Sequence, residues 1–485
     1  MALSSSLSLL LPALLLPLAG AASIDASAAS FIVNKDVVIL GGGASGAHAA
    51  VRLREDYGKS VIVVENQAQL GGHVETYEDP VTGKPYDFGV NSYTEYGNSK
   101  EFFARFNVSI EVPARLTLNT TYVDFESGNE LDGYVSPASA DVTAGLNKYL
   151  TICEQYEDIL LPSYANFPTE NIPEDLLIPF SDFITKYELE VIVPRIFQVT
   201  GIGLGNMASE LTIYVMQTFG APITRSLLGL TDSFVPVSRR NQDLYDNIAD
   251  LLGDDVMYSA TTINSSRADN ATVQLLVRGS DSKLTLINAK KLLISFSPTM
   301  ENLKPFLIDT KERDVFSAWG LSHVYAGIVN SADLPINYSL VNYPESAVPT
   351  NYLELPTTPL VGRYEYLGGD NFRVLATGDQ NSTTTSESAQ SLVHSVFRKL
   401  QAGVIKQLSG TTGNASLEFA AWTEHLGISA HLPVEVIEGG FYRDLYALQG
   451  YRSTFYTGGA FAADFSTLLW EYNDQYLLPK LLAAL

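Results

Sequence analysis

The chain has 485 residues, of which 46% are hydrophobic and 17% are charged, a composition that indicates a folded globular protein and excludes a disordered one. Its formal net charge of -24 at pH 7 would repel phosphate backbones, so we exclude nucleic acid as a partner. A chain of this length exceeds one core of ordinary size, and we expect two closely packed domains.

The first residues have the pattern of a secretory signal peptide. Residues 9–18 form an apolar run, and the small residues AGAAS at 19–23 suit cleavage near Ala21. No Lys or Arg precedes the run, so a membrane anchor or a core helix stays open as the alternative. The run is short for a bilayer and charges interrupt every later apolar run, so we expect no membrane span. We predict that residues 1–21 are removed and that the mature protein is secreted or lies in the secretory-pathway lumen.

Two further features of the composition bear on that compartment. The single cysteine, Cys153, excludes an intramolecular disulfide, so the fold depends on its core. Seven Asn-X-Ser/Thr triplets are candidate glycan sites in a secreted protein. They begin at Asn107, Asn119, Asn264, Asn270, Asn337, Asn381 and Asn414.

Residues 35–95 have the pattern of a strand, a helix, a second strand and a Gly-rich crossover. The runs KDVVIL at 35–40 and SVIVVE at 60–65 are typical of buried parallel strands. Between them, residues 44–57 place small side chains along one helical face. The segment therefore predicts a β-α-β unit.

The middle of the chain alternates between helical and strand patterns. Helical spacing at 144–156 and 180–189 predicts a mostly helical insertion over 100–230, which we place on the substrate side. Alternation over 320–380 predicts the sheet of a second domain, followed by an amphipathic helix at 386–407.

Several short runs predict strands outside that second sheet. Those at 256–258, 272–277 and 284–287 predict a small antiparallel meander. Residues 289–296 predict another buried strand, and residues 453–476 predict a strand, a Gly turn and a helix.

The stretch 41–46, GGGASG, fits the dinucleotide-binding pattern G-x-G-x-x-G. The pattern alone is weak, but here it follows a buried strand, opens a helix and precedes Glu65, which ends the next strand 19 residues after Gly46. Gly41 allows the tight turn, Gly43 lets a pyrophosphate approach the backbone, and Gly46 lets the helix pack on the strand. The helix N-terminus would bind the phosphates, and Glu65 would bind ribose hydroxyls and disfavour a 2′-phosphate. The alternative is a turn that binds nothing.

The segment 36–77 resembles the FAD-binding start of the flavin amine oxidase and phytoene desaturase superfamily. There a strand-end Glu is followed by a short loop and a Gly-Gly pair close to the cofactor, and residues 71–72 match that pair. Residues 86–89, YDFG, resemble the strand that brings a Gly beside the flavin, and residues 454–461, TFYTGGAF, resemble the last strand. The resemblance implies FAD as the cofactor. It also implies an α/β fold, with a glutathione-reductase-like segmented Rossmann FAD domain and an α+β substrate-binding domain.

The same resemblance implies domain boundaries and FAD contacts. Segments 31–99, 235–300 and 430–485 would form the FAD-binding domain, and segments 100–234 and 301–429 the substrate or cap domain. The expected FAD contacts lie in the glycine turn, at the tip of the second strand, around the Gly-Gly pair and near the last strand. They are Gly41, Gly43, Ala44, Ser45, Gly46, Glu65, Gly71, Gly72, His73, Gly89, Val90, Ile263, Gly458, Gly459, Ala460 and Phe461.

Four stretches resemble a group of secreted fungal enzymes within this superfamily that oxidise secondary metabolites. They are GGHVET at 71–76, GGFY at 439–442, LQG at 448–450 and LWEYN at 469–473. The likeness extends over most of the chain and implies C–H oxidation that drives ring closure. The strand at 320–329 lacks the Lys that amine oxidases place beneath the flavin, which argues against simple amine oxidation.

His73 is the first candidate for a chemical role, because it follows the Gly-Gly pair where amine oxidases usually carry Arg. It could hydrogen-bond the flavin, act as a base, form a covalent flavin link or be only a structural contact. Tyr451 is the second candidate, because related enzymes place aromatic walls around the substrate there, although core packing is the alternative. Arg452 could bind a carboxylate or enolate, or lie at the surface. The other histidines show no metal spacing, and we predict no metal site.

We therefore expect an enzyme, an FAD-dependent dehydrogenase or oxidase. It would remove hydride from a small organic substrate and return the electrons to oxygen or another acceptor. Amine oxidation is one alternative, and double-bond isomerisation of polyunsaturated fatty acids, which consumes no acceptor, is another. A flavin carrier without catalytic activity is the alternative from a different class.

Overall fold

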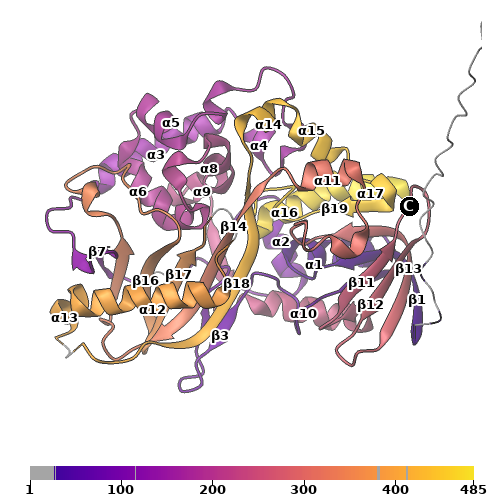
Figure 1. Ribbon diagram of the computed structural model, residues 1–485, viewed down its shortest axis with the longest axis horizontal. Helices are drawn as coiled ribbons and strands as arrows, with labels where there is room; N and C mark the ends of the chain where they lie inside the picture. The colour runs from indigo at the N-terminus through magenta and orange to yellow at the C-terminus, as the bar shows by residue number, and fades with distance from the viewer. Residues whose placement is uncertain (1–23, 25–26, 28, 115, 380–382, 411–412) are drawn as a thin grey trace, which may run out of the picture.

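The computed structural model describes residues 24, 27, 29–114, 116–379, 383–410 and 413–485. The predicted signal peptide, residues 1–21, and the glycan site at Asn381 lie outside the described residues. Two large β-sheets organise the chain: one lies on the right in Figure 1, and the other lies on the left beneath a group of helices. No helix in the described part of the chain combines the length and the apolar character needed to cross a membrane.

The first sheet has seven strands among the described residues, in the order β10-β2-β1-β13-β12-β11, with β19 paired to β13. Its centre is parallel, and only the pairs β13–β12 and β12–β11 are antiparallel. Every side chain of β2 is buried, as expected of a strand that is covered on both faces. The bounds are β1 Phe31–Leu40, β2 Val61–Val64, β10 Val256–Met257, β11 Thr261–Ser266, β12 Val273–Arg278, β13 Leu284–Ile294 and β19 Thr454–Tyr456.

The structure corrects two expectations about this sheet. The run at 256–258 is not part of the meander: β10 pairs in parallel with β2. The two strands expected at 284–287 and 289–296 are one strand, β13. Along one edge, β13 pairs with β12 at residues 284–289 and with β19 at residues 292–294. The amino-acid sequence of β13 does not reveal this change of partner.

The second sheet also has seven strands within the described ranges, in the order β18-β14-β17-β16-β15-β7-β8. All neighbours are antiparallel except β15 and β7. Buried side chains of this sheet, among them Tyr325 and Tyr364, form a core with the helix α12 (Ser386–Ala402). The strand bounds are β7 Asn119–Asp124, β8 Asn129–Glu130, β14 Gly320–Asn330, β15 Tyr338–Asn342, β16 Leu360–Gly368, β17 Asn371–Thr377 and β18 Glu418–His431.

The helical insertion lies above the second sheet in Figure 1. Its α-helices are α3 Ser139–Cys153, α4 Glu157–Leu160, α5 Phe180–Lys186, α6 Val193–Ile196, α7 Ile202–Leu204, α8 Thr212–Thr218 and α9 Ala221–Leu227. The helix expected at 144–156 begins earlier, at Ser139. The helix expected at 180–189 ends at Lys186, because Glu188 takes a left-handed φ of 50° that a helix cannot continue through.

The remaining helices pack around the first sheet and along the second. α1 (Ala44–Val51) packs against α16 (Ser466–Tyr472). The amphipathic helix expected at 386–407 is two helices, α12 and α13 (Val404–Ser409), because Gly403 between them has a non-helical φ of -105° and ψ of -109°. A Cβ at this position would lie 2.2 Å from the Gly128 carbonyl oxygen, which favours glycine there. The other elements are α2 Ser99–Arg105, α10 Gln242–Leu252, α11 Thr310–Phe316, α14 Val434–Glu438, α15 Phe441–Tyr446, α17 Leu478–Ala484, β3 Thr76–Glu78, β4 Pro85–Asp87, β5 Tyr93–Thr94, β6 Ile110–Glu111 and β9 Ser233–Pro236.

The strands of each large sheet come from several separate segments of the chain. Every strand of the first sheet lies within 31–99, 235–300 or 430–485. The strands of the second sheet lie within 100–234 or 301–429, apart from the last two residues of β18. Distant parts of the chain therefore assemble each sheet.

A buried ion pair joins three of these distant parts behind the first sheet. Arg267, just after β11, donates to Glu312 on α11 at 2.7 Å, and both side chains are fully buried. The guanidinium also donates to the Phe306 carbonyl at 2.7 Å and to Thr454 Oγ1 on β19 at 3.0 Å, and Tyr456 donates to Glu312 at 3.0 Å. Because each charge is buried, each depends on the other.

We predict that Glu312→Gln lowers the free energy of unfolding by about 3–5 kcal/mol, because the buried Arg267 charge loses its counter-charge. Denaturant unfolding followed by circular dichroism measures the change. Glu126→Gln is the matched control, since Glu126 is 88% exposed and pairs with Lys399 at the surface. Equal effects of the two substitutions would contradict the prediction.

Candidate functional site

A cavity of about 760 Å³ lies at the carboxyl ends of the parallel strands of the first sheet. Leu40 at the end of β1, Val64 at the end of β2 and Ser295 after β13 all line it. In open α/β sheets this edge is where ligands bind. The cavity continues to β18 of the second sheet, so both halves of the molecule contribute to it.

The glycine turn after β1 forms one wall of the cavity. Gly41 takes a φ of 96°, which favours glycine, and Gly43 caps the N-terminus of α1. A Cβ on Gly72 would lie 2.8 Å from the Gly43 Cα, so the two backbones meet without side chains between them. The exposed backbone and the N-terminus of α1 form a cradle for a phosphate group.

Two residues of α16 and its extension hold the first turn of α1 in place. Trp470 donates from its indole nitrogen to the Ala44 carbonyl at 3.1 Å. Asn473 donates to the Ser45 carbonyl at 2.9 Å. The cradle is thus fixed by residues more than 400 positions away in the sequence.

Glu65 lies at the tip of β2 and is almost fully buried. One of its carboxylate oxygens accepts from the Gly42 amide at 2.6 Å, and the other accepts from the Gln67 amide at 2.7 Å. The carboxylate lines the cavity and each oxygen keeps a further acceptor site. It can therefore brace the glycine turn and still accept from a ribose hydroxyl.

His73 lies farther along the cavity, after the Gly71–Gly72 loop. Its ring stacks on His425 of β18, with 4.2 Å between centroids and 23° between planes. Burial lowers the pKa of His73 below its usual value near 6.5, and the Asp464 carboxylate opposes that shift. Burial, with His73 beside it, lowers the pKa of His425 well below its usual value. Both imidazoles are therefore neutral near pH 7.

Asp87 supports the wall next to His73. It accepts from Thr76 Oγ1 at 2.5 Å and from the Asn241 amide at 3.1 Å, and the Asn241 side chain donates to the Val90 carbonyl at 2.7 Å. Val90 lines the cavity. Burial raises the pKa of Asp87 to about 7, against the hydrogen bonds that it accepts.

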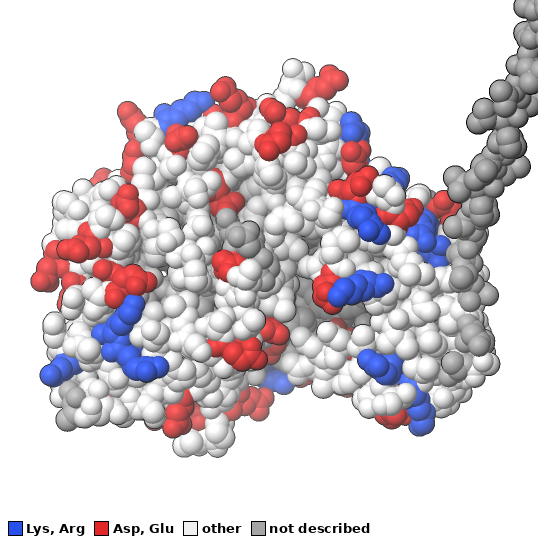
Figure 2. Space-filling model, viewed as in Figure 1, with Lys and Arg blue, Asp and Glu red and all other residues white. Residues whose placement is uncertain are grey.

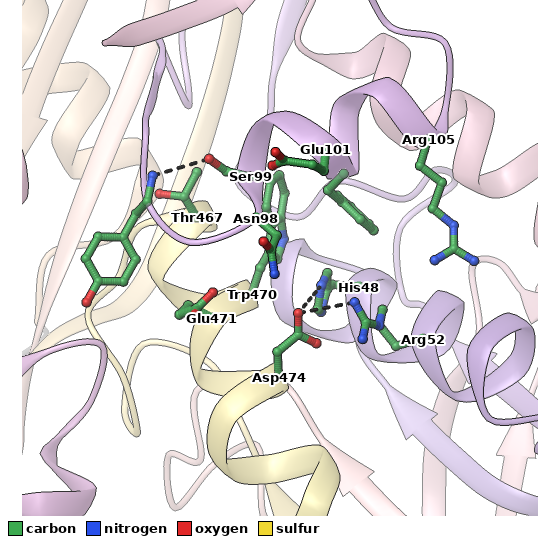
Figure 3. Close-up of a pocket in the computed structure, with 12 residues that line it drawn as sticks. His48, Arg52, Asn98, Ser99, Glu101, Arg105, Thr467, Trp470, Glu471 and Asp474 are labelled. Carbon is green, nitrogen blue, oxygen red and sulfur yellow. Dashed lines mark hydrogen bonds and ion pairs between the residues drawn. The ribbon is translucent and has the colours of Figure 1, made fainter. Parts of the chain in front are cut away.

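A second, smaller pocket of about 130 Å³ is lined by residues of α1, α2 and α16 (Figure 3). Asp474 points toward His48 and Arg52, at 3.7 Å and 3.3 Å. Burial raises the pKa of Asp474 to about 6, although Arg52 opposes the shift. Thr467 lines both this pocket and the large cavity, so the two share a wall.

Known proteins resemble the chain over nearly its whole length. FAD-dependent oxidoreductase pigF of Monascus ruber is 36% identical over 464 residues, which cover 94% of this chain and 93% of that protein. Beta-cyclopiazonate dehydrogenase of Aspergillus oryzae is 32% identical over 451 residues, 92% of each chain. The chain belongs to this family of FAD-dependent oxidoreductases.

Other comparisons agree on the fold of this FAD-dependent oxidoreductase. A family model described as an NAD(P)-binding Rossmann-like domain matches residues 39–106. The structure titled CLA-producing fatty acid isomerase from P. acnes superposes with a TM-score of 0.71 at 16% identity, over 92% of this chain and 98% of that one. A putrescine oxidase triple mutant gives 0.64 at 13% identity, over 93% and 100%. The expected α/β fold with a Rossmann FAD domain is confirmed.

The residues of the large cavity fit FAD, the cofactor of this family. Most of the expected contacts line the cavity, from the glycine turn to Gly458 and Gly459. Ser45 Oγ and Thr262 Oγ1 are buried without a partner among the described residues, and both residues line the cavity. A buried hydroxyl without a partner destabilises the fold unless a ligand or water pairs with it.

Several expected site residues do not line the cavity. Gly46 packs against the turn instead, since a Cβ there would lie 2.0 Å from the Gly41 carbonyl oxygen. Ile263 is 37% exposed on β11, where the lining ends at Thr262. Ala460 and Phe461 lie behind the cavity wall, and the buried Phe461 ring stacks on Tyr456.

Tyr451 lies outside the cavity, which corrects the expectation that it faces the substrate, and Arg452, for which the sequence left two alternatives open, also lies outside it. The Tyr451 hydroxyl donates to Asp309 at 2.6 Å. Arg452 donates to Glu312 at 2.9 Å and to the Leu307 carbonyl at 3.1 Å. Both side chains therefore make their hydrogen bonds with residues in and just before α11, and neither binds a substrate group.

Other lining residues were not expected from the sequence. Val199 and Thr200 come from a π-helical turn, Phe197–Gly201, in the helical insertion. Glu424 and Leu426 come from β18. π-Helical turns often occur at functional sites, but a short helical pattern does not reveal one in a sequence.

We predict that Gly43→Val yields a folded but colourless protein. The Gly43 Cβ position is already 3.4 Å from the Gly72 Cα, so a larger side chain must occupy the phosphate space. The absorption spectrum measures FAD content, and circular dichroism verifies the fold. Gly279→Val, in the turn between β12 and β13 away from the cavity, is the control and should stay yellow. A fully flavinylated Gly43→Val would contradict the phosphate cradle.

Asp87 provides a prediction about pH. Its pKa in the folded protein, about 7, is above the ordinary value of 3.8, so folding favours its protonated form. The stability it contributes is complete below about pH 4 and is lost as the pH rises through 7. We expect the stability of the wild type relative to Asp87→Asn to fall over pH 4–7 and to stay level above that range. Urea unfolding across pH 4–8 measures this, and a constant difference would refute it.

Proposed function

We propose that this FAD-dependent oxidoreductase removes hydride from a small organic substrate held beside His73 and passes the electrons to oxygen or another acceptor. The observation that carries the proposal is the extent of the cavity. It extends to a space lined by Val199, Thr200 and Ile223 of the helical insertion, a segment that supplies none of the expected FAD contacts. That space can hold a substrate next to the flavin.

We assign the FAD contacts by position along the cavity. The glycine turn and the N-terminus of α1 would hold the pyrophosphate, and Glu65 the ribose of the adenosine. The Gly71–Gly72 loop with Gly89 and Val90 would contact the flavin, and Gly458–Gly459 would lie at its other end. When bound, FAD supplies the ring that accepts hydride.

His73 is our candidate for a proton acceptor. A C–H bond of the substrate loses hydride while a neighbouring O–H or N–H loses a proton, and a neutral imidazole can take that proton. Burial keeps His73 neutral at physiological pH. The stacked His425 ring limits how His73 can turn.

The substrate class is proposed from the relatives. Beta-cyclopiazonate dehydrogenase is named for a secondary metabolite, and we propose a substrate of that kind, with oxidation coupled to ring closure. A secreted location is proposed from the N-terminal apolar run. All six candidate glycan asparagines in the described residues are exposed, which such modification requires.

Isomerisation and amine oxidation are the two alternative reactions. The resemblance in fold to a fatty acid isomerase favours isomerisation as the second candidate, in which no acceptor is consumed. Amine oxidation is disfavoured because β14 carries no Lys.

We predict that a panel of indole-type metabolites contains a substrate that bleaches the flavin band near about 450 nm, with matching oxygen or dye consumption. His73→Gln should keep FAD and lower kcat at least about tenfold, since it cannot accept a proton. In this variant, the fall of kcat/KM at acidic pH should also be absent. Turnover without acceptor consumption would favour the isomerase, and no bleaching by any substrate would favour a carrier.

A further inference from the structure

The helical insertion presents a small, uncharged surface to the large cavity. On the outside, Figure 2 shows acidic side chains spread over the upper and left parts of the face in view, where the insertion lies in Figure 1. Inside, the described residues of the insertion that line the cavity are Val199, Thr200 and Ile223, and none of them carries a charge. A molecule in this part of the cavity therefore meets two aliphatic side chains and one threonine.

The second sheet holds the helix that carries Thr200. This helix runs through α6, the π-helical turn Phe197–Gly201 and α7. Three side chains from the sheet donate to carbonyls that are spaced four residues apart along it, which fixes how the helix is turned. The bonds are Tyr343 to the Pro194 carbonyl at 3.4 Å, Arg363 to the Gln198 carbonyl at 3.1 Å and Thr377 to the Ile202 carbonyl at 2.6 Å.

A chain of contacts connects Thr200 with His73. Gly203, three residues after Thr200, lies on the same face of the helix, and a Cβ there would lie 3.8 Å from the Val324 Cγ2. Val324 is the cross-strand partner of His425, so these two side chains point to the same side of the sheet. His425 in turn stacks on His73. Thr200 is therefore on the His73 side of the cavity.

The buried hydroxyl of Thr200 has no partner among the described residues. Threonine in a helix commonly donates to the carbonyl four residues earlier, as Thr218 does at 3.0 Å and Thr224 at 2.8 Å. A buried hydroxyl without a partner costs stability until a ligand or water pairs with it. Because threonine adopts two side-chain rotamers in helices and Thr200 lines the cavity, its hydroxyl can turn to a molecule bound there.

We infer that Thr200 is a specificity-determining residue: its hydroxyl binds a hydroxyl or carbonyl group of the substrate, while Val199 and Ile223 contact an apolar part of the same molecule. Pockets that combine apolar walls with a few polar groups select ligands in this way. The inference rests on the proposed function, since it requires that this space holds the substrate. It deepens that proposal by naming the group that the enzyme recognises.

The first test uses purified holoprotein and two probes that differ by one hydroxyl, 3-ethylindole and indole-3-ethanol. Perturbation of the flavin absorption measures the Kd of each probe without requiring turnover. Thr200→Val keeps the shape of the side chain and removes the hydroxyl. We expect it to weaken binding of the alcohol relative to 3-ethylindole by at least about threefold, the worth of one hydrogen bond.

Two further variants complete this test. Thr200→Ser retains the hydroxyl and should keep the ratio of the two Kd values within about twofold of the wild type. Thr218→Val is the matched control, because Thr218 is also a half-buried helical threonine of the insertion, has its own partner and lies outside the cavity lining. This control should leave the ratio unchanged.

The second test needs no probe. Urea unfolding of the holoprotein should show a higher midpoint for Thr200→Val than for the wild type, because the substitution removes a hydroxyl that lacks a partner. Thr218→Val should not raise the midpoint, since its hydroxyl already donates to the Tyr214 carbonyl.

An unchanged ratio of Kd values in Thr200→Val would overturn the inference, because the hydroxyl would then bind no ligand group. A lower urea midpoint for Thr200→Val would also overturn it, because the hydroxyl would then have a partner already. A flavin spectrum that no probe perturbs would overturn the proposed function instead, so the two failures are distinguishable.

Discussion

The backbone of the turn after β1 lies so close to the backbone of the Gly71–Gly72 loop that no side chain fits between them. Two distant parts of the chain hold the turn and the start of α1 in place. Ser295, after β13, donates to the carbonyls of the turn, and Trp470 and Asn473 hold the first turn of α1 from the C-terminal end of the chain. The phosphate cradle therefore exists only when the segmented domain has assembled, which ties cofactor binding to the complete fold.

A cradle made of backbone amides has a consequence for the rest of the cavity. The pyrophosphate can be held by the N-terminus of α1 and the glycine turn without Lys or Arg. No Lys or Arg occurs among the described lining residues and His73 is neutral, so the negative charge of the cofactor is not offset by a side-chain cation in the cavity. The electrostatics of the substrate space thus follow from the way in which the phosphates are held.

The second sheet contributes to the chemistry mainly through β18, its long edge strand. β18 places His425 against His73, and Leu426 and Ile428 of the same strand are among the residues that line the cavity. The buried pair of Arg267 and Glu312 stabilises the region behind the first sheet, and it also engages Arg452, which the sequence left open as a substrate ligand. A residue that resembles a substrate ligand in sequence can thus serve stability alone.

Local patterns in the sequence determined the parts of the protein that depend on neighbouring residues. The buried runs of β1 and β2, the glycine turn between them and Glu65 at the second tip are all encoded within about 30 residues, so the Rossmann unit and its cofactor could be predicted. Only the tertiary structure decided which distant residues reach the cavity. Thr200, Leu426 and Ile428 lie in segments separated from the glycine turn by more than 150 residues, and no spacing rule connects them. The same holds for Tyr451, whose hydroxyl is bound by Asp309. Periodicity records which face of an element is apolar, but the direction that a side chain takes in space is set by the packing of elements that are far apart in the chain.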